Sequence, residues 1–498
     1  MAKTLMIQGT CSDAGKSILV AAFCRIYTRR GYRVSPFKSQ NMSLNSFVTP
    51  EGYEIGRAQA VQAQAAKRAP HVDMNPVLLK PEGDSRSQIV LMGKPWKSQD
   101  ASDYFMTKKA LWVEVSSALD RLMDDNDLVI IEGAGSPAEI NLNEHEIVNM
   151  AVARFLDAPV LLTGDIDRGG VFASLYGTLV LVDEDRHRIK GFLINKFRGD
   201  VSLLTPGLKM LEDRCGGVPT LGVIPFIPDI YLAQEDSVFI DKNRQFGDRD
   251  GLPLVVIKLP HMSNYDDFDP FLNEKGLSIH FISQPSELPE TTAALLLPGT
   301  KTTIQDLQWL KETGLFARIR QLAEEGTPVV GICGGYQMMG SMIQDPEAVE
   351  TGGGSMEALG LLNAKTIFSK EKTTLQTRGR LILNKGFFRN IHNQSCSGYE
   401  IHMGETRNLS EGNALYRRED GSFDGSVSED GLCWGSYMHG IFDNQTLRRA
   451  FLMSLGWHPG EEGKSEETLR EQEFERIADV VEQAVDMDAL DRLIGLKV

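Results

Sequence analysis

Two groups of residues in this chain have types and spacings suited to chemistry. The first is GTCSDAGKS, from Gly9 to Ser17, which has the glycines, lysine and hydroxyl of a loop that binds a nucleoside triphosphate. The second is GICGGYQMMG, from Gly331 to Gly340, with SYMHGIFDN (Ser436 to Asn444) farther along the chain. It offers a cysteine nucleophile on a glycine-flanked turn and a histidine as its base. Together they predict an ATP-driven reaction fed by a hydrolysed intermediate, of which glutamine-dependent amidation is the commonest example.

The N-terminal motif has five residues between Gly9 and Gly15, whereas the usual Walker A loop has four. It follows a predicted strand and opens a predicted helix, so backbone N–H groups and the helix dipole would face phosphate oxygens. Lys16 is expected to reach the terminal phosphates, and the Ser17 hydroxyl is expected to bind Mg²⁺. The alternative is a glycine-containing turn with a solvated lysine.

The cysteine motif reads strand, Gly-x-Cys-x-Gly, then helix, which is the geometry of a nucleophile elbow. Cys333 would gain acidity from the helix N-terminus, and His439 is the candidate base. The backbone N–H groups of Gly299 and Gly334 are the expected oxyanion hole. The alternatives are a buried, inert cysteine and a structural histidine.

Polar residues also follow two predicted strands, in KSQNMSLNS (Lys38 to Ser46) and DIDRGG (Asp165 to Gly170). Open α/β sheets bind ligands at the carboxyl ends of their strands, although ordinary loop chemistry explains these segments equally well. The candidate residues for binding an acceptor substrate are Lys38, Gln40, Asn41, Asp165 and Asp167.

Short apolar runs alternate with helical stretches, which predicts an α/β protein with two domains, each a mostly parallel sheet flanked by helices. The predicted domains are residues 1–245 and 252–498, joined by a polar linker at Lys242 to Gly251. The region from Thr373 to Trp434 is expected to be antiparallel. Apolar residues at helical spacing after Trp457 predict a C-terminal amphipathic helix, assigned to the second domain. The predicted buried strands are 5–8, 33–37, 128–132, 159–163, 191–195, 221–224, 254–259, 279–283, 293–297 and 328–332.

Composition excludes several classes of protein. The 498 residues carry a net charge of −16, and with no basic run this argues against nucleic-acid binding. Six scattered cysteines without a C-x-x-C pair indicate neither a structural metal nor disulfides, and favour a reducing cytosol. With neither a signal peptide nor a transmembrane run, the expected location is cytoplasmic, without membrane partners. The oligomeric state is not predicted.

The nucleotide motif resembles dethiobiotin synthetase and its relatives, which share the GT-x5-GK-[ST] loop. The segment LVIIEGAG, Leu128 to Gly135, strengthens this resemblance. It implies that Glu132 helps to hold Mg²⁺ and that Asn195 contacts adenine, although a plain strand-end carboxylate and a strand-capping asparagine remain open. The candidate ATP-binding residues are Gly9, Asp13, Gly15, Lys16, Ser17 and Asn195.

The cysteine motif resembles class I glutamine amidotransferases, whose core motif is G-x-C-x-G-x-Q. The resemblance implies that Gln337 contacts the bound glutamine. The family's glutamate two residues after the histidine is replaced here by Ile441, as in the cobyrinic-acid amidase branch. The third member is therefore absent, or Asp443 or Glu400 takes its role.

Within that branch the chain resembles the cobyric acid synthase family, on PFKSQNMSLNS, GAGSPAEINL, DIDRGGVFAS, LPHMSNYDDFDP, PGTKTTIQDLQWL and SGYEIHMG. The resemblance implies ATP- and glutamine-dependent amidation of the b, d, e and g carboxylates of adenosylcobyrinic acid a,c-diamide, in cobalamin biosynthesis. The partners it implies are glutamine and a corrinoid polycarboxylate, and the cofactors ATP and Mg²⁺. The alternatives are a cobyrinic acid a,c-diamide synthase and a partitioning-type P-loop ATPase with a pseudo-glutaminase domain.

Overall fold

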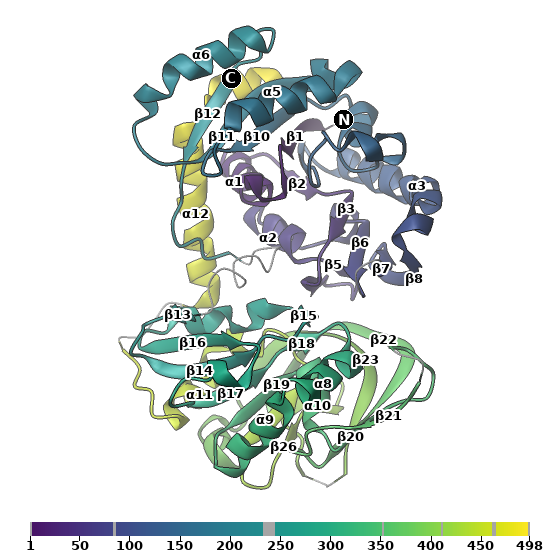
Figure 1. The fold of residues 1–498 in the computed structure, drawn as a ribbon, viewed down its shortest axis with the longest axis vertical. Helices are drawn as coiled ribbons and strands as arrows, with labels where there is room; N and C mark the ends of the chain where they lie inside the picture. Colours follow the sequence, from purple (N-terminus) through teal and green to yellow (C-terminus); the bar gives the residue numbers. More distant parts are fainter. Residues whose placement is uncertain are drawn as a thin grey trace. The chain divides into compact units, whose positions relative to one another are not determined.

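The computed structural model describes residues 2–82, 86–232, 245–350, 353–409, 412–460 and 465–496. The chain forms two compact units, whose elements can be followed by colour in Figure 1. The first unit comprises Met1–Ser43, Ile55–Ala233 and Glu467–Val498, and the second comprises Leu44–Glu54 and Gln234–Glu466. Each unit is therefore assembled from segments that are distant in the sequence.

The first unit is built on a six-stranded parallel sheet in the order β12-β11-β10-β1-β9-β2. The expected strands of this half are confirmed. Alternate residues of one strand serve opposite faces: Leu128 and Ile130 join one apolar cluster, and Val129 and Ile131 join the other. The strands are β1 (Lys3–Gly9), β2 (Val34–Phe37), β9 (Leu128–Glu132), β10 (Val160–Asp165), β11 (Ile189–Phe197) and β12 (Thr220–Pro225).

Helices cover both faces of this sheet. One face packs against α1 (Lys16–Arg29), α2 (Arg57–Ala65), α12 (Glu466–Ala484) and α13 (Met487–Ile494). The other packs against α3 (Ala101–Asp125), α4 (Met150–Leu156), α5 (Val171–Leu181) and α6 (Thr205–Arg214). A separate sheet has the order β3-β6-β7-β8, with β3 (Gln40–Met42), β6 (Val77–Pro81), β7 (Arg86–Leu91) and β8 (Lys94–Asp100).

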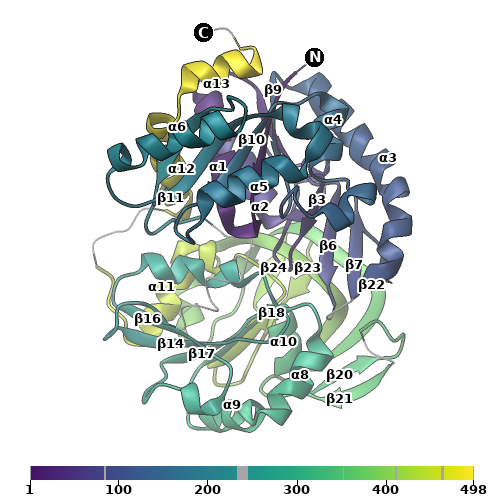
Figure 2. The ribbon, with the colours of Figure 1, turned by 45° about the horizontal axis from the view of Figure 1, so that its top comes forward.

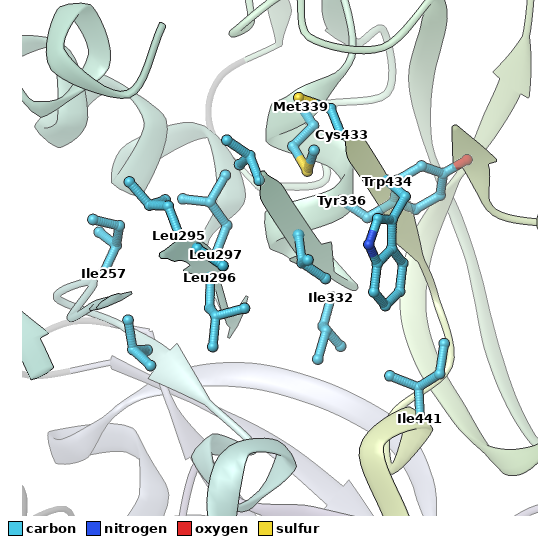
Figure 3. Packing of buried hydrophobic residues seen from close by; sticks show 14 of the residues in the cluster. Ile257, Leu295, Leu296, Leu297, Ile332, Tyr336, Met339, Cys433, Trp434 and Ile441 are labelled. Atoms are coloured by element: carbon cyan, nitrogen blue, oxygen red, sulfur yellow. The ribbon is translucent and has the colours of Figure 1, made fainter. Parts of the chain in front are cut away.

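The second unit has a seven-stranded sheet in the order β13-β16-β14-β17-β19-β27-β26. The inner strands run parallel, and the edge strands β13 and β26 pair antiparallel. Its strands are β13 (Gln245–Gly247), β14 (Leu252–Ile257), β16 (Leu277–Ile282), β17 (Ala294–Leu297), β19 (Val329–Ile332), β26 (Ser426–Val427) and β27 (Cys433–Ser436). Figure 3 shows part of the apolar core beside this sheet.

The expected linker at Lys242 to Gly251 needs correction. Gln245–Gly247 forms β13, which hydrogen-bonds along β16 as an edge strand. Residues 242–244 lie outside the described part of the chain. A polar, glycine-containing stretch can serve as a sheet edge because one side of an edge strand faces solvent.

A second, mostly antiparallel sheet accompanies the seven-stranded one, and its pairing across residues 373–424 is antiparallel, as the sequence predicts. The long strands β22 (Ala364–Leu381) and β23 (Ser395–Asn408) pair with each other. The other strands of this second sheet are β20 (Met342–Asp345), β21 (Gly354–Glu357), β24 (Tyr416–Arg418) and β25 (Phe423–Asp424). The α-helices in the described part of this unit are α8 (Thr303–Glu312), α9 (Leu315–Glu324), α10 (Gly334–Met339) and α11 (Gln445–Ser454).

The compact units differ from the expected halves, 1–245 and 252–498, in two segments. Helices α12 and α13, expected with the second domain, pack on α1 in the first unit (Figure 2). Arg25 of α1 bonds to Glu471, with Nη2 2.9 Å from Oε1, and the Tyr27 hydroxyl donates to Asp491 over 2.8 Å. Conversely, the segment Leu44–Glu54, expected with the first domain, belongs to the second unit. The amphipathic character of the C-terminal helix predicted its burial but could not indicate its partner.

Among the described helices, none has the length and apolar character needed to cross a membrane.

Candidate functional site

The glycine loop joins β1 to α1 as expected. A Cβ atom at Gly9 would lie 2.8 Å from the Cys11 carbonyl oxygen, and Gly15 has a φ of 91°. Lys16 is buried, and its Nζ donates to the carbonyl oxygens of Cys11 and Ser12 over 2.9 and 3.0 Å. The lysine therefore lies over its own loop, where phosphate oxygens could replace the carbonyls as its acceptors.

A buried cluster surrounds Glu132 at the end of β9. The Ser17 hydroxyl donates to its Oε1 over 2.8 Å, Lys38 Nζ lies 3.0 Å from the same oxygen, and the Gln62 amide donates to Oε2. Burial alone would raise the pKa of Glu132, but the charge of Lys38 and these hydrogen bonds hold it below its usual value. Glu132 is thus an ionised carboxylate in contact with the loop's hydroxyl.

This donor set fits Mg²⁺. Ser17 and Glu132 present a hydroxyl and an ionised carboxylate, the hard oxygen ligands that the ion prefers. No group of three or more His, Cys, Asp or Glu suited to a metal occurs among the described residues. Mg²⁺ needs few protein ligands when phosphates and waters supply the others.

Asn195, at the end of β11, touches the loop itself. Its Nδ2 donates to the Ala14 carbonyl over 2.9 Å and lies 2.1 Å from where a Cβ atom at Gly15 would stand. Lys196 Nζ donates to the Asp13 carbonyl over 2.7 Å and to Asp165 over 2.9 Å. Asn195 and Lys196 thus hold the loop by hydrogen bonds to its carbonyl oxygens. The adenine contact expected of Asn195 stays a prediction.

Of the residues expected to bind an acceptor, two lie at the nucleotide loop and the others have different contacts. Lys38 belongs to the Glu132 cluster, and Asp165 pairs with Lys196 and Arg168 at the nucleotide loop. Asn41, beside Gln40 on β3, donates to Gln59 over 3.0 Å. Asp167 lies 3.4 Å from Arg198. The structure thus brings Lys38 and Asp165 to the nucleotide loop, while a role in acceptor binding stays a prediction for all of these residues.

Cys333 lies on the expected strand–turn–helix, between β19 and α10. Its backbone is in an unusual conformation, with φ 53° and ψ −109°, as expected of a nucleophile elbow. A Cβ atom at Gly335 would lie 2.1 Å from the Leu297 carbonyl oxygen, so the turn requires glycine there. The thiol lies at the start of α10.

His439 lies next to Cys333 and is held by an aspartate. His439 Nδ1 lies 2.7 Å from Asp267 Oδ2, and the Cys333 thiol donates to the Ile401 carbonyl over 3.4 Å. The other oxygen of Asp267 accepts from the Gly440 N–H over 2.7 Å. Burial opposes a charged imidazole, but the charges of Asp267 and Cys333 outweigh it and raise the pKa of His439 to about 10. The three side chains form a Cys–His–Asp arrangement.

The expectation that Asp443 or Glu400 replaces the missing glutamate is corrected by this geometry, because Asp267 occupies the Nδ1 side of His439. Glu400 instead accepts from Tyr416 and Arg418, over 3.0 and 2.9 Å. Ile441 is fully buried among apolar side chains such as Trp434 (Figure 3), so a carboxylate at this position would lie in the core.

Asp267 was missed because it precedes His439 by 172 residues. It lies on the 3₁₀ segment η6 (Tyr265–Asn273), within the SNYDDFDP stretch that carried the family resemblance. The available signal was an unexplained acidic pair, Asp266 and Asp267, after a predicted strand.

The expected oxyanion donors lie close to this arrangement. A Cβ atom at Gly299 would stand 3.0 Å from His439 Cε1, and Gly334 is the first residue of α10 after Cys333. Gln337 is buried, and its amide donates to the Met403 carbonyl over 2.9 Å and accepts from the Thr303 hydroxyl over 3.0 Å. Gln337 thus links Thr303 of α8 to Met403 of β23 beside the site. Its contact with bound glutamine stays a prediction.

Known proteins resemble this chain along its whole length. A family model described as CobB/CobQ-like glutamine amidotransferase domain matches residues 253–447, and one described as CobQ/CobB/MinD/ParA nucleotide binding domain matches residues 5–238. A cobyric acid synthase of Dehalococcoides mccartyi (strain CBDB1) is 48% identical over 503 residues, covering 99% of both chains. That of Sorangium cellulosum (strain So ce56) is 48% identical over 517 residues, again covering 99% of both. Among solved structures, a glutamine amidotransferase crystal structure is 20% identical, covers 42% of this chain and 100% of its own, and has a TM-score of 0.31.

Proposed function

The chain belongs to the cobyric acid synthase family of glutamine-hydrolysing amidoligases, and on that premise we propose that it amidates the b, d, e and g carboxylates of adenosylcobyrinic acid a,c-diamide, using ATP and glutamine. The family resemblance drawn from the sequence is confirmed, as is the α/β fold with two domains. The corrin substrate and the use of ATP are the proposed part.

The second unit releases ammonia from glutamine. The thiolate of Cys333 attacks the side-chain amide carbon, and the N–H groups of Gly299 and Gly334 bind the oxyanion that develops. His439 takes the thiol proton and gives it to the departing nitrogen, while Asp267 holds the imidazole by Nδ1. Water then cleaves the thioester and releases glutamate.

The first unit makes an acceptor carboxylate reactive toward that ammonia. ATP would supply the phosphoryl group for this activation, and Ser17 and Glu132 would hold Mg²⁺, which would neutralise phosphate charge. Lys16 exchanges its loop carbonyls for phosphate oxygens. The backbone of the loop from Gly9 to Gly15 binds the phosphates, and Asn195 braces it.

The observation that carries this proposal is a complete Cys–His–Asp arrangement in a chain that also has a braced phosphate loop. The test is mass spectrometry of the corrinoid after incubation with ATP and glutamine. Conversion of the a,c-diamide through successive amidations supports the proposal. Consumption of cobyrinic acid instead would identify an a,c-diamide synthase, and a lack of glutamate release would indicate a partitioning-type ATPase with a pseudo-glutaminase domain.

A further inference from the structure

The segment Leu44–Glu54 lies between two segments of the first unit in the sequence, but it belongs to the second unit. It contains β4 (Ser46–Val48) and ends at Glu54, the first residue of β5 (Glu54–Gly56), with which β4 pairs. The Gln376 amide donates to the Val48 carbonyl, and Lys372 pairs with Glu54, which is fully buried as a side chain. Two anchors on β22 therefore fix this segment in the second unit.

The segment bonds closely to Asn264. The Asn264 N–H donates to Asn45 Oδ1 over 2.8 Å, and its Nδ2 donates to the Ser46 carbonyl over 2.9 Å and to the Tyr399 hydroxyl over 2.8 Å. Asn264 is buried and has a φ of 51°, a conformation that asparagine tolerates better than most residues. The segment thus determines where Asn264 and Tyr399 lie.

Both of these residues position His439. The Asn264 carbonyl accepts the N–H of Asp267 over 3.1 Å, at the start of η6. The Tyr399 ring stacks on the His439 ring at 5.3 Å and 20°, and the two residues exchange backbone hydrogen bonds of 2.8 and 3.2 Å. The imidazole is therefore oriented by Asp267 and by Tyr399. Asn264, which bonds to Leu44–Glu54, contacts both of these residues.

Residues on either side of this segment contact Glu132, which in turn contacts the nucleotide loop through Ser17. Lys38 comes shortly before it and Gln62 shortly after it, and in the first unit both bind Glu132. A metal ion held by Ser17 and Glu132 would compete with Lys38 and Gln62 for the carboxylate oxygens of Glu132. Each flank of the segment thus begins near a side chain whose contacts such a ligand would alter.

We propose that Leu44–Glu54 is a positioning element for the His439–Asp267 pair, acting through Asn264 and Tyr399, and that it makes glutamine hydrolysis depend on the state of the nucleotide site. The proposal rests on the proposed function. A ligand that orders the two flanks holds the segment, and therefore the imidazole, in the geometry described.

The test compares Asn45→Ala and Asn264→Gly with the control Glu51→Gln, which changes an exposed side chain on the same segment. Glycine at 264 keeps the left-handed backbone while removing the amide. We expect both variants to lower kcat for glutamine hydrolysis by about 10- to 100-fold with little change in KM, because a slightly misplaced group costs that much. Amidation driven by ammonium should stay at the wild-type rate, as should every activity of the control.

A second readout addresses the coupling. ATP with the corrinoid acceptor should accelerate glutamate release by the wild-type protein about 5-fold or more, and should have no effect on Asn264→Gly. Wild-type hydrolysis rates in both variants, or no acceleration of the wild-type protein, would overturn the inference. Wild-type protein that amidates no corrinoid with either nitrogen source would instead contradict the proposed function.

Discussion

In the nucleotide loop, Lys16 bonds to carbonyl oxygens of its own loop and Glu132 is surrounded by Ser17, Lys38 and Gln62. In the second unit, His439 already bonds to Asp267 and lies beside Cys333, the two groups it needs for chemistry. The first site must exchange protein partners for ligand atoms, whereas the second is arranged before glutamine arrives. The difference predicts which substitutions act on chemistry and which act on ligand binding.

The largest expected effect is that of Cys333→Ala. Without the thiol there is no nucleophile, so glutamine-dependent amidation should fall by at least about 10⁴-fold. Amidation with high ammonium should persist, because the first unit is untouched. Both rates are measured by mass spectrometry of the product, and a variant inactive with both nitrogen sources would contradict the division of labour between the units.

Asp267→Asn should lower glutamine hydrolysis by about 10³-fold, because an amide neither fixes the imidazole tautomer nor stabilises its charge. The pKa of His439 should fall from about 10, so the alkaline limb of the pH–rate profile should move to lower pH. For the same reason the wild-type pair stabilises the fold fully below pH 6.5 and loses this contribution as the pH rises through about 10.

The matched control is Asp443→Asn, which changes one of the two carboxylates that the sequence left open for this role. It should hydrolyse glutamine at nearly the wild-type rate. If Asp443→Asn lost activity while Asp267→Asn kept it, the assignment of the third member would be reversed.

Lys16→Ala should reduce amidation by about 10²–10³-fold with either nitrogen source, because one charged donor to the phosphates is lost. Basal glutamate release should be unchanged. The comparison uses Lys190→Ala, an exposed lysine of the same sheet, and a circular dichroism melt to check folding. Normal turnover with ammonium would show that this loop does not bind the reacting phosphates.

The smallest effect is expected for Asn195→Ala. It removes the hydrogen bond to the Ala14 carbonyl, worth about 1 kcal/mol, from a loop that must hold its shape to bind phosphates. The KM for ATP should rise by no more than about 10-fold, with kcat nearly unchanged. A large fall in kcat would mean that the side chain touches the reacting groups.

The sequence predicted the buried strands well because runs such as Leu128–Glu132 are apolar on both faces, a pattern with few other solutions. It also predicted the elbow at Cys333, whose turn needs glycines that adjoin it in the chain. Asp267 could not be found in this way, since its partner is distant in sequence and no local pattern joins them. The placements of Leu44–Glu54 and of α12 depend on tertiary packing that periodicity does not report.

The packing of α12 and α13 on the first unit has a consequence for synthesis on the ribosome. Phe474, Ile477 and Val481 of α12 belong to the cluster that covers β1 and α1, and the Asp486 N–H donates to the Leu221 carbonyl over 2.8 Å. Residue 221 therefore emerges long before the residues that cover it, a delay on the order of tens of seconds at ordinary elongation rates. During that time the nascent first unit exposes apolar surface while the second unit is made, so the unit synthesised first is completed last.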